Sequence, residues 1–155
     1  MKKFIFTILT ITLLFSCKDD DQLTFQQQLD EDIAEIEAHL ASNGLTATKD
    51  PTGIFYFIED EGEGTDNPAV TSTVSVAYSG KFLSGDVFDS ATTINPLSIA
   101  LGNTIPGWQV GIPLFKKKGK GTLYIPSGYG YGVNGTFGIP GNTILIFDIE
   151  LLNFN

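Results

Sequence analysis

Arginine is absent from this 155-residue chain, and cysteine and histidine occur once each. A single cysteine excludes an intramolecular disulfide, and one cysteine with one histidine cannot make a Cys/His zinc site. Basic residues total 9 against 18 acidic ones, which gives a formal net charge of −9. Nucleic-acid binding needs a basic face that neutralises phosphates, and this composition does not provide one. We therefore expect no metal, no cofactor and no nucleic-acid partner.

Hydrophobic residues are plentiful, at 42% of the chain, and the sequence has 17 glycines and 12 phenylalanines. That content is enough to build one hydrophobic core, and the length fits a single domain. Glycine marks turns and phenylalanine favours strands. The composition therefore predicts a domain with many strands and many turns.

The first 16 residues have the pattern of a signal peptide. Two lysines precede an apolar run over residues 4–15, which is shorter than the roughly 20 residues of a membrane-spanning helix. Residues 14–17, Leu-Phe-Ser-Cys, resemble the lipobox of bacterial lipoproteins, in which a small residue precedes a lipidated cysteine. The resemblance implies that Cys17 carries a lipid anchor. The alternative is a free thiol.

A lipid anchor at Cys17 implies a location in the bacterial cell envelope, at the outer membrane, with the domain either periplasmic or surface-exposed. Residues 17–23 predict a short acidic tether between the anchor and the domain. Lys18 is followed there by three aspartates. This run resembles the surface-export signal of lipoproteins in one phylum of Gram-negative bacteria, and a purely solvated spacer is the equal alternative.

Residues 24–43 predict an amphipathic helix. Thr24 and Gln27 fit a capping box at its start, and Gly44 fits the glycine that follows a helix end. Apolar residues recur with the period of a helix, at Phe25, Leu29, Ile33, Ile36 and Leu40. Acidic residues make up the opposite side, at Asp30, Glu31, Asp32, Glu35 and Glu37. The apolar stripe must pack either on the following domain or on a second copy of the helix, which would make a homodimer.

His39 is expected on the surface of this helix. From residue 53 onward the pattern changes to that of β-strands. Residues 54–58 are continuously β-prone, residues 73–78 alternate, and residues 144–152 form a largely apolar strand. Short strands are expected at residues 81–83, 87–89, 97–101 and 121–125, and a glycine-rich loop at residues 126–142. With one short helix inside this region, the pattern predicts an α+β domain whose antiparallel sheet curls around a helix.

That short helix is expected to begin near Gly107, because Pro106 lacks a backbone donor and its fixed φ suits the first helical turn. Trp108, the only tryptophan, would then lie in the first turn. Its indole is either ordinary core or the base of an apolar pocket. We favour the pocket because of the motifs that surround it in the chain.

Five separated motifs resemble those of the FKBP family of macrolide-binding immunophilins. They occur in the family's order and cover residues 54–154. The motifs are Val76-Ala77-Tyr78-Ser79-Gly80, Val87-Phe88-Asp89-Ser90, Leu101-Gly102 with Ile105-Pro106-Gly107-Trp108, Ile125-Pro126 with Tyr129-Gly130-Tyr131-Gly132, and Ile139-Pro140-Gly141-Asn142 with residues 145–152.

The resemblance implies a five- to six-stranded antiparallel sheet wrapped around a short helix, over a domain at residues 48–155. It also implies peptidyl-prolyl cis-trans isomerase activity on proline-containing polypeptides, with macrolide immunosuppressants as candidate ligands. The implied catalytic residues are Tyr78, Phe88, Asp89, Trp108, Tyr131 and Phe147. The implied substrate-binding residues are Leu97, Thr104, Ile105 and Ile139.

The residue types suit this reaction, because rotation about an X-Pro bond needs no protein nucleophile. A dry aromatic box would favour the twisted, less polar amide over the planar one. Asp89 is expected either to orient the peptide or only to cap the turn at Ser90. The alternative function is a module in a cell-envelope complex that binds proline segments, or acts as a chaperone, without catalysis.

Overall fold

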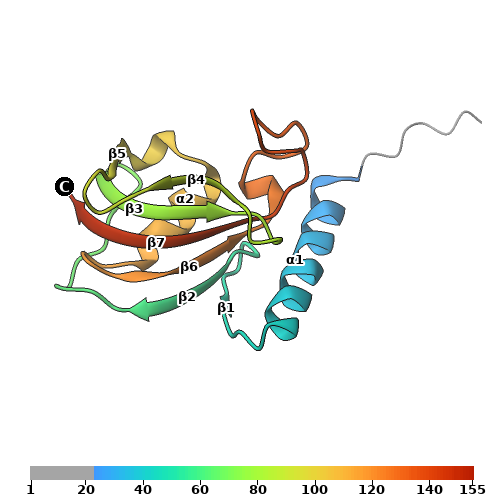
Figure 1. Ribbon diagram of the computed structural model, residues 1–155, viewed down its shortest axis with the longest axis horizontal. Helices are drawn as coiled ribbons and strands as arrows, with labels where there is room; N and C mark the ends of the chain where they lie inside the picture. Colours follow the sequence, from blue (N-terminus) through green and yellow to red (C-terminus); the bar gives the residue numbers. More distant parts are fainter. Residues whose placement is uncertain (1–22) are drawn as a thin grey trace, which may run out of the picture.

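The computed structural model describes residues 23–155 (Figure 1). The predicted signal peptide, the predicted lipid anchor at Cys17 and residues 17–22 of the predicted tether lie outside the described residues. Within residues 23–155, none of the helices is long and apolar enough to cross a membrane.

Helix α1 (Phe25–Ser42) lies within the predicted residues 24–43, and Thr24 and Asn43 are its cap residues. The Thr24 hydroxyl accepts from the Gln27 N–H at 3.3 Å, and the Thr24 N–H donates to Gln27 Oε1 at 2.9 Å. At the other end Gly44 has a positive φ of 63°, and the N–H of Leu45 donates to the carbonyl of Leu40 at 2.9 Å. The capping box and the glycine stop are therefore confirmed.

Seven strands form one antiparallel sheet in the order β1-β2-β6-β7-β3-β4, with β5 also paired to β3 (Figure 1). Their bounds are β1 (Thr48–Lys49), β2 (Phe55–Asp60), β3 (Thr73–Lys81), β4 (Val87–Ala91), β5 (Leu97–Ala100), β6 (Lys120–Ile125) and β7 (Leu145–Phe154). The α+β prediction is confirmed. The sheet has one strand more than the five to six expected, because β1 is only two residues long and leaves no periodic signal.

One predicted strand, residues 81–83, is wrong. Lys81 is the last residue of β3, and the chain then turns at once into β4. The Phe82 N–H donates to the Asp86 carbonyl at 3.0 Å, and the Gly85 N–H donates to the Phe82 carbonyl at 2.9 Å. These bonds close a tight turn, which the β-prone residues 82 and 83 concealed.

Helix α2 (Pro106–Gly111) starts one residue before Gly107, near which it was expected to begin, and packs closely on β6. A side chain at Gly107 would overlap Ile125, and one at Gly111 would overlap Leu123. The two glycines, four residues apart, share one face of the helix and let it approach the sheet. Short 3-10 turns flank it at η1 (Leu101–Asn103) and η2 (Ile112–Leu114), and η3 (Ser127–Tyr129) follows β6.

Alternating residues of β6 and β7 separate two hydrophobic clusters on opposite faces of the sheet. The cluster on the α2 face includes Trp108, Phe115, Leu123, Ile125, Leu145, Phe147 and Ile149. The cluster under α1 consists of Ile36, Leu40, Phe55, Tyr124, Ile144 and Ile146. The stripe of α1 thus packs on the chain's own domain, which was the first of the two alternatives.

One expectation for α1 is wrong. Asp32, placed on the polar side by the period of the sequence, is buried. His39 is partly exposed on the helix surface, and its ring lies 6.1 Å from that of Tyr124.

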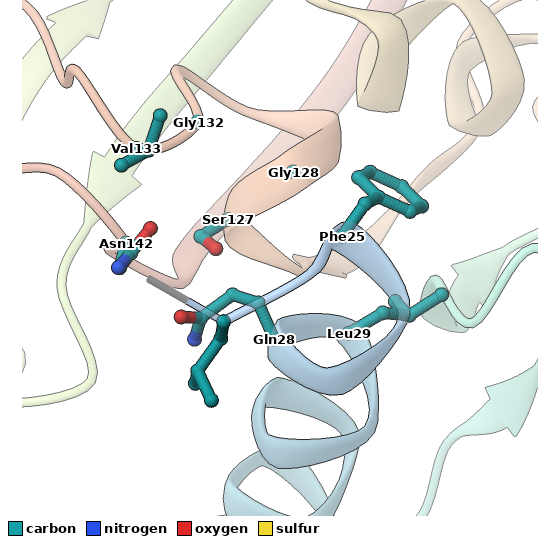
Figure 2. A pocket seen from close by; sticks show the side chains of 9 residues that line it. Phe25, Gln28, Leu29, Ser127, Gly128, Gly132, Val133 and Asn142 are labelled. Atoms are coloured by element: carbon teal, nitrogen blue, oxygen red, sulfur yellow. The ribbon is translucent and has the colours of Figure 1, made fainter. Parts of the chain in front are cut away.

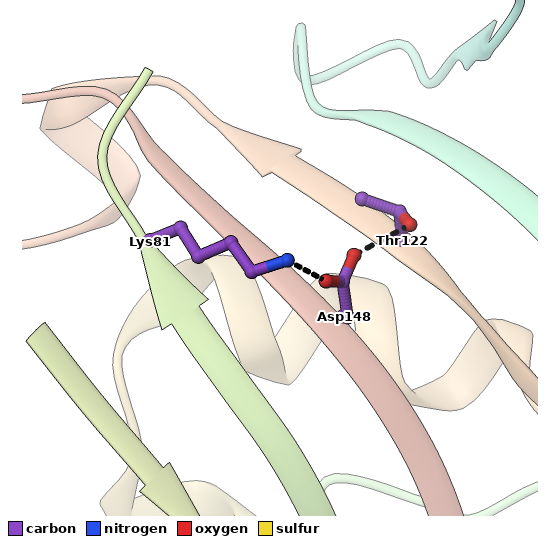
Figure 3. A network of polar contacts seen from close by, with 3 residues as sticks. All are labelled: Lys81, Thr122 and Asp148. Atoms are coloured by element: carbon purple, nitrogen blue, oxygen red, sulfur yellow. Dashed lines mark hydrogen bonds and ion pairs between the residues drawn. The ribbon is translucent and has the colours of Figure 1, made fainter. Parts of the chain in front are cut away.

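An ion-pair network joins the three central strands on the face away from α2 (Figure 3). Lys81 contacts the carboxylate of Asp148, whose Oδ1 also accepts from the Thr122 hydroxyl at 2.9 Å. Asp148 lies between Phe147 and Ile149 along β7, so its side chain points to the opposite face. The network ties β3, β7 and β6 together away from the cavity described next.

Candidate active site

A cavity of about 260 Å³ lies between α2, the sheet and the loop of residues 126–142. Nine of the ten predicted site residues line it: Tyr78, Phe88, Asp89, Leu97, Thr104, Ile105, Trp108, Tyr131 and Phe147. Ile99 and Asn103 also line it and were not predicted. Both are sequence neighbours of predicted residues, and the motifs alone gave no reason to include them.

Ile139 is the predicted site residue that does not line the cavity. It is only 7% exposed and packs in the same hydrophobic cluster as Trp108 and Phe147. Its N–H donates to the Thr136 carbonyl at 2.9 Å, within the base of its loop. The structure therefore places Ile139 in the core beside the cavity rather than at its surface.

Four aromatic rings from β3, β4, α2 and β7 make the walls and base of the cavity. The Trp108 ring lies 5.1 Å from Tyr78 and 5.3 Å from Phe147, with interplanar angles of 87° and 80°. Phe88 meets Phe147 at 5.6 Å and 89°. These are edge-to-face contacts, the arrangement that aromatic quadrupoles favour. The rings hold one another in place and leave their remaining surfaces to the cavity.

Gly80 makes the approach of these rings feasible. A Cβ built on Gly80 would lie 2.7 Å from Phe88 Cζ and 2.9 Å from Phe147 Cε1. Both distances are far below an ordinary contact, so either ring would have to move. The glycine that closes the strand motif of residues 76–80 thus sets the shape of the cavity wall.

Trp108 lies at the base, with 4% of its surface exposed. Within residues 23–155, its indole N–H is buried without a hydrogen-bond partner. Leaving such a donor unpaired costs about 1–3 kcal/mol. The indole at the base of the cavity therefore makes only apolar contacts within the described residues, although its ring carries an N–H group.

Asp89 and Tyr78 form the polar edge of the cavity. The Tyr78 hydroxyl donates to Asp89 Oδ2 at 2.6 Å, and Asp89 Oδ1 accepts from the Ser90 N–H at 2.8 Å. Asp89 and Ser90 both lie inside β4 rather than in a turn, so this carboxylate does not cap a turn as one alternative expected, and it orients a ring of the cavity instead. Burial raises the pKa of Tyr78, and the hydrogen bond and charge of Asp89 raise it further.

Tyr131 is 39% exposed and lines the cavity from the loop. Burial raises the pKa of its hydroxyl, and the negative charge of Asp89 adds to the effect. Both cavity tyrosines are thus protonated at neutral pH. Tyr131 can donate a hydrogen bond to a ligand from the cavity's rim.

The segment before α2 supplies a second donor. Ile105 is the N-cap residue of α2, and within the described chain its own N–H makes no hydrogen bond. Gln109, which sequence reasoning missed, donates from Nε2 to the Thr104 carbonyl at 2.8 Å and holds this segment on the helix. Its position one residue after Trp108 was the only available signal.

Among residues 23–155, no group of three or more His, Cys, Asp or Glu side chains is arranged to hold a metal ion. The polar side chains that line the cavity are those of Asp89, Tyr78, Tyr131, Asn103 and Thr104, and the Ile105 backbone N–H joins them. Such a set binds and orients an amide, and it lacks a nucleophile paired with a base.

A sheet wrapped on a short helix, with an aromatic cavity between them, defines an FKBP-like domain. The sequence profile of the FKBP-type peptidyl-prolyl cis-trans isomerases matches residues 64–152. The chain therefore belongs to the FKBP-type peptidyl-prolyl cis-trans isomerase family.

The chain is similar to the FKBP-type isomerase FkpA of Escherichia coli, with 43% identity over 103 residues, 66% of this chain and 38% of the relative. FkpA of Aeromonas hydrophila is 34% identical over 86% of this chain and 48% of its own length. The chain thus spans less than half the length of these curated relatives.

Two solved structures share the fold. The crystal structure of FkpA from Escherichia coli has a TM-score of 0.71 and 35% identity, covering 84% of this chain and 64% of that one. The peptidyl-prolyl cis-trans isomerase from Pseudomonas syringae has a TM-score of 0.71 and 27% identity, covering 86% and 98%. Both comparisons extend beyond the family match at residues 64–152.

Proposed function

We propose that this chain is a peptidyl-prolyl cis-trans isomerase that assists the folding of exported proteins. The observation that carries the proposal is the cavity walled by Tyr78, Phe88, Trp108 and Phe147 in a chain of this family. The proposed substrates are polypeptide segments in which a proline ring enters that cavity.

The enzyme would lower the barrier to rotation about the X-Pro bond. Without catalysis this barrier is about 18–20 kcal/mol, because the amide C–N bond is partly double. Twisting the amide destroys its resonance, so the carbonyl oxygen loses negative charge. Water stabilises the polar planar form, and a site lined by rings does not. Transfer into the cavity therefore favours the twisted form over the planar one, which is differential binding of the transition state.

Each polar group has a proposed role in holding the peptide. The Ile105 N–H and the Tyr131 hydroxyl bind substrate carbonyls on either side of the proline. Asp89 orients Tyr78 and, through it, the ring wall. Anchoring the peptide at two points leaves the X-Pro bond as the axis that turns.

The test is relaxation of a cis-enriched X-Pro-Phe peptide in the presence of the chain from Lys18 onward. Acceleration that follows enzyme concentration supports the proposal. A folded protein that gives no acceleration contradicts it. Peptide binding without acceleration would favour the second candidate, a binding module of a cell-envelope complex.

We further propose that residues 1–16 are a lipoprotein signal peptide and that residues 17–23 tether the domain to a lipid on Cys17. The proposal rests on the residue pattern at positions 14–17. Labelling of cells with a fatty-acid analogue tests it. Label on the wild type and none on Cys17→Ser is the expected result, and equal label on both contradicts it.

Macrolide immunosuppressants are proposed as competing ligands of the same cavity, because a rigid ring system can occupy aromatic walls that accept proline. Competition with the peptide in the relaxation assay tests this. An unchanged isomerisation rate at a saturating macrolide concentration contradicts it.

A further inference from the structure

Asp32 is a charged side chain that helix α1 carries into the interior. It is 2% exposed, and it lies outside the part of the chain that matches the family. Its Oδ2 accepts from the N–H and from the hydroxyl of Ser127, both at 2.7 Å, and its Oδ1 accepts from Gln28 Nε2 at 2.8 Å. A buried carboxylate is tolerated only with such partners, so these donors define its position.

Ser127 holds the backbone around Tyr131 through hydrogen bonds to its carbonyl. Its carbonyl accepts from the N–H of Gly130 at 3.0 Å and from the N–H of Gly132 at 2.8 Å. These two glycines flank Tyr131 in the chain. Gly132 in turn accepts from the Asn142 N–H at 2.9 Å, at the far end of the loop. The position of Ser127 therefore sets the backbone on both sides of Tyr131.

An aromatic contact also joins α1 to the loop, beside the hydrogen bonds of Asp32. Phe25, in the first turn of α1, meets Tyr129 at 5.8 Å and 71°. Gly128 leaves room for it, since a Cβ there would lie 2.5 Å from Phe25 Cε2. Figure 2 shows the first turns of α1 beside η3, with Phe25 next to Gly128. The residues drawn there line a cavity of about 350 Å³ at this junction. The helix thus meets the loop at η3, where the loop begins.

The loop needs this support because its own sequence does not define one conformation. Within residues 126–142, Gly132, Gly135 and Gly138 have positive φ values, a region that glycine enters as readily as the negative one. Ordering such residues costs more conformational entropy than ordering others. Fixed contacts at Ser127 reduce the number of states open to Tyr131.

We propose that Asp32 is a positioning residue, which holds the loop through Ser127 so that the Tyr131 hydroxyl faces the cavity. This inference rests on the proposed isomerase function, in which Tyr131 binds the substrate. A helix outside the family match thereby controls the geometry of the site. Small displacements of a binding group are known to reduce rates by large factors.

The first experiment compares Asp32→Ala with the wild type in the full chain. We expect kcat/KM to fall about tenfold, because two buried donors of Ser127 lose their acceptor and the loop shifts. Asp30→Ala is the matched control: Asp30 is an exposed carboxylate on the same helix, bonded to Gln26 Nε2 at 2.8 Å. It should leave kcat/KM unchanged.

A double-mutant cycle with Tyr131→Phe separates positioning from a general loss of stability. If Asp32 acts through the Tyr131 hydroxyl, Asp32→Ala has little further effect once that hydroxyl is gone. Asp32→Asn keeps an acceptor oxygen for Ser127, while Gln28 can turn its amide toward the new NH2 group. It should restore most of the activity.

Ser127→Ala is the milder second variant, to be read if Asp32→Ala does not fold. It removes one donor and keeps the N–H bond to Asp32, so we expect a loss of about threefold, again absent in the Tyr131→Phe background. Hydrogen exchange gives a readout that does not need catalysis. Amides of residues 127–142 should exchange faster in the variants, and those of β3 and β7 should not.

The proposal is overturned by a folded Asp32→Ala with wild-type kcat/KM, by additive losses in the double-mutant cycle, or by exchange that rises equally throughout. A wild type that accelerates no proline peptide overturns the proposed function instead. In that case the exchange of residues 127–142 still decides whether Asp32 holds the loop.

Discussion

The hydroxyl of Tyr78 donates a hydrogen bond of 2.6 Å to Asp89 Oδ2, which links β3 to β4 at the edge of the aromatic cavity. The same carboxylate accepts the Ser90 N–H through its other oxygen. One acidic side chain therefore holds a ring of the cavity and also bonds the backbone of its own strand.

Tyr78→Phe should lower stability by about 1 kcal/mol, because the ring stays and the Asp89 carboxylate loses one donor at a partly exposed position. Isomerisation should slow, since the ring is no longer held. Urea unfolding and the peptide relaxation assay measure the two effects. An unchanged rate would show that the position of the Tyr78 ring does not depend on its hydrogen bond to Asp89.

The tyrosine pKa values also predict a dependence on alkaline pH. Burial raises the folded-state pKa of Tyr78, Tyr124 and Tyr131 above the ordinary value of 10.0. Their contribution to stability is complete below pH 10 and is lost as the pH rises through the folded-state pKa values, because the unfolded chain ionises first. Urea unfolding from pH 8 to 11 should show this fall. A slope in Tyr78→Phe equal to that of the wild type would contradict it.

Gly80→Ala should destabilise the protein by about 1–3 kcal/mol and reduce activity, because its Cβ would displace Phe88 or Phe147. Gly102→Ala is the control, since the nearest atom to a Cβ there is a Val70 oxygen at 3.4 Å, an ordinary contact. That variant should lie within about 0.5 kcal/mol of the wild type. Equal effects of both substitutions would show that the contact at Phe88 has no special role.

Tyr131→Phe should reduce kcat/KM about tenfold with no change in stability. The hydroxyl belongs to an exposed residue, so folding loses nothing, while the substrate carbonyl loses a donor. Chemical unfolding confirms the first half and the relaxation assay the second. Wild-type activity in a folded Tyr131→Phe would mean that a group other than the Tyr131 hydroxyl binds the substrate carbonyl.

Trp108 is the only tryptophan, so its emission reports directly on the base of the cavity. Titration with a proline peptide should change the wavelength and the intensity of this emission until the cavity is saturated, because the peptide displaces water from the cavity. The same peptide with alanine for proline is the control and should give a much weaker change. Saturable changes that are identical for both peptides would mean that the cavity does not select proline.

Local pattern alone was sufficient for several elements. The Thr24–Gln27 box, the glycine after α1 and Pro106 at the start of α2 act within one helical turn, so neighbouring residues specify them. The apolar periods of β3 and β7 likewise follow from the pleat of a strand. The motifs between them were specific enough to indicate the family and nine residues of the cavity wall.

The errors lie where a distant partner decides. β1 exists only because β2 passes beside it, and residues 82–83 turn because Asp86 and Gly85 bond across them. The motif that contains Ile139 placed this residue at the cavity. The packing of its loop puts the side chain in the core beside the cavity.

By itself, the sequence determined the positions of most helices and strands and their apolar faces. Those properties depend on side chains a few residues apart. Tertiary structure alone decided that Asp32 is buried, because Ser127, 95 residues away, brings two donors to its carboxylate. A hydrogen bond between residues so far apart leaves no periodic signal in the sequence. Seen within its own segment, each of the two residues is a polar residue that would be expected on the surface.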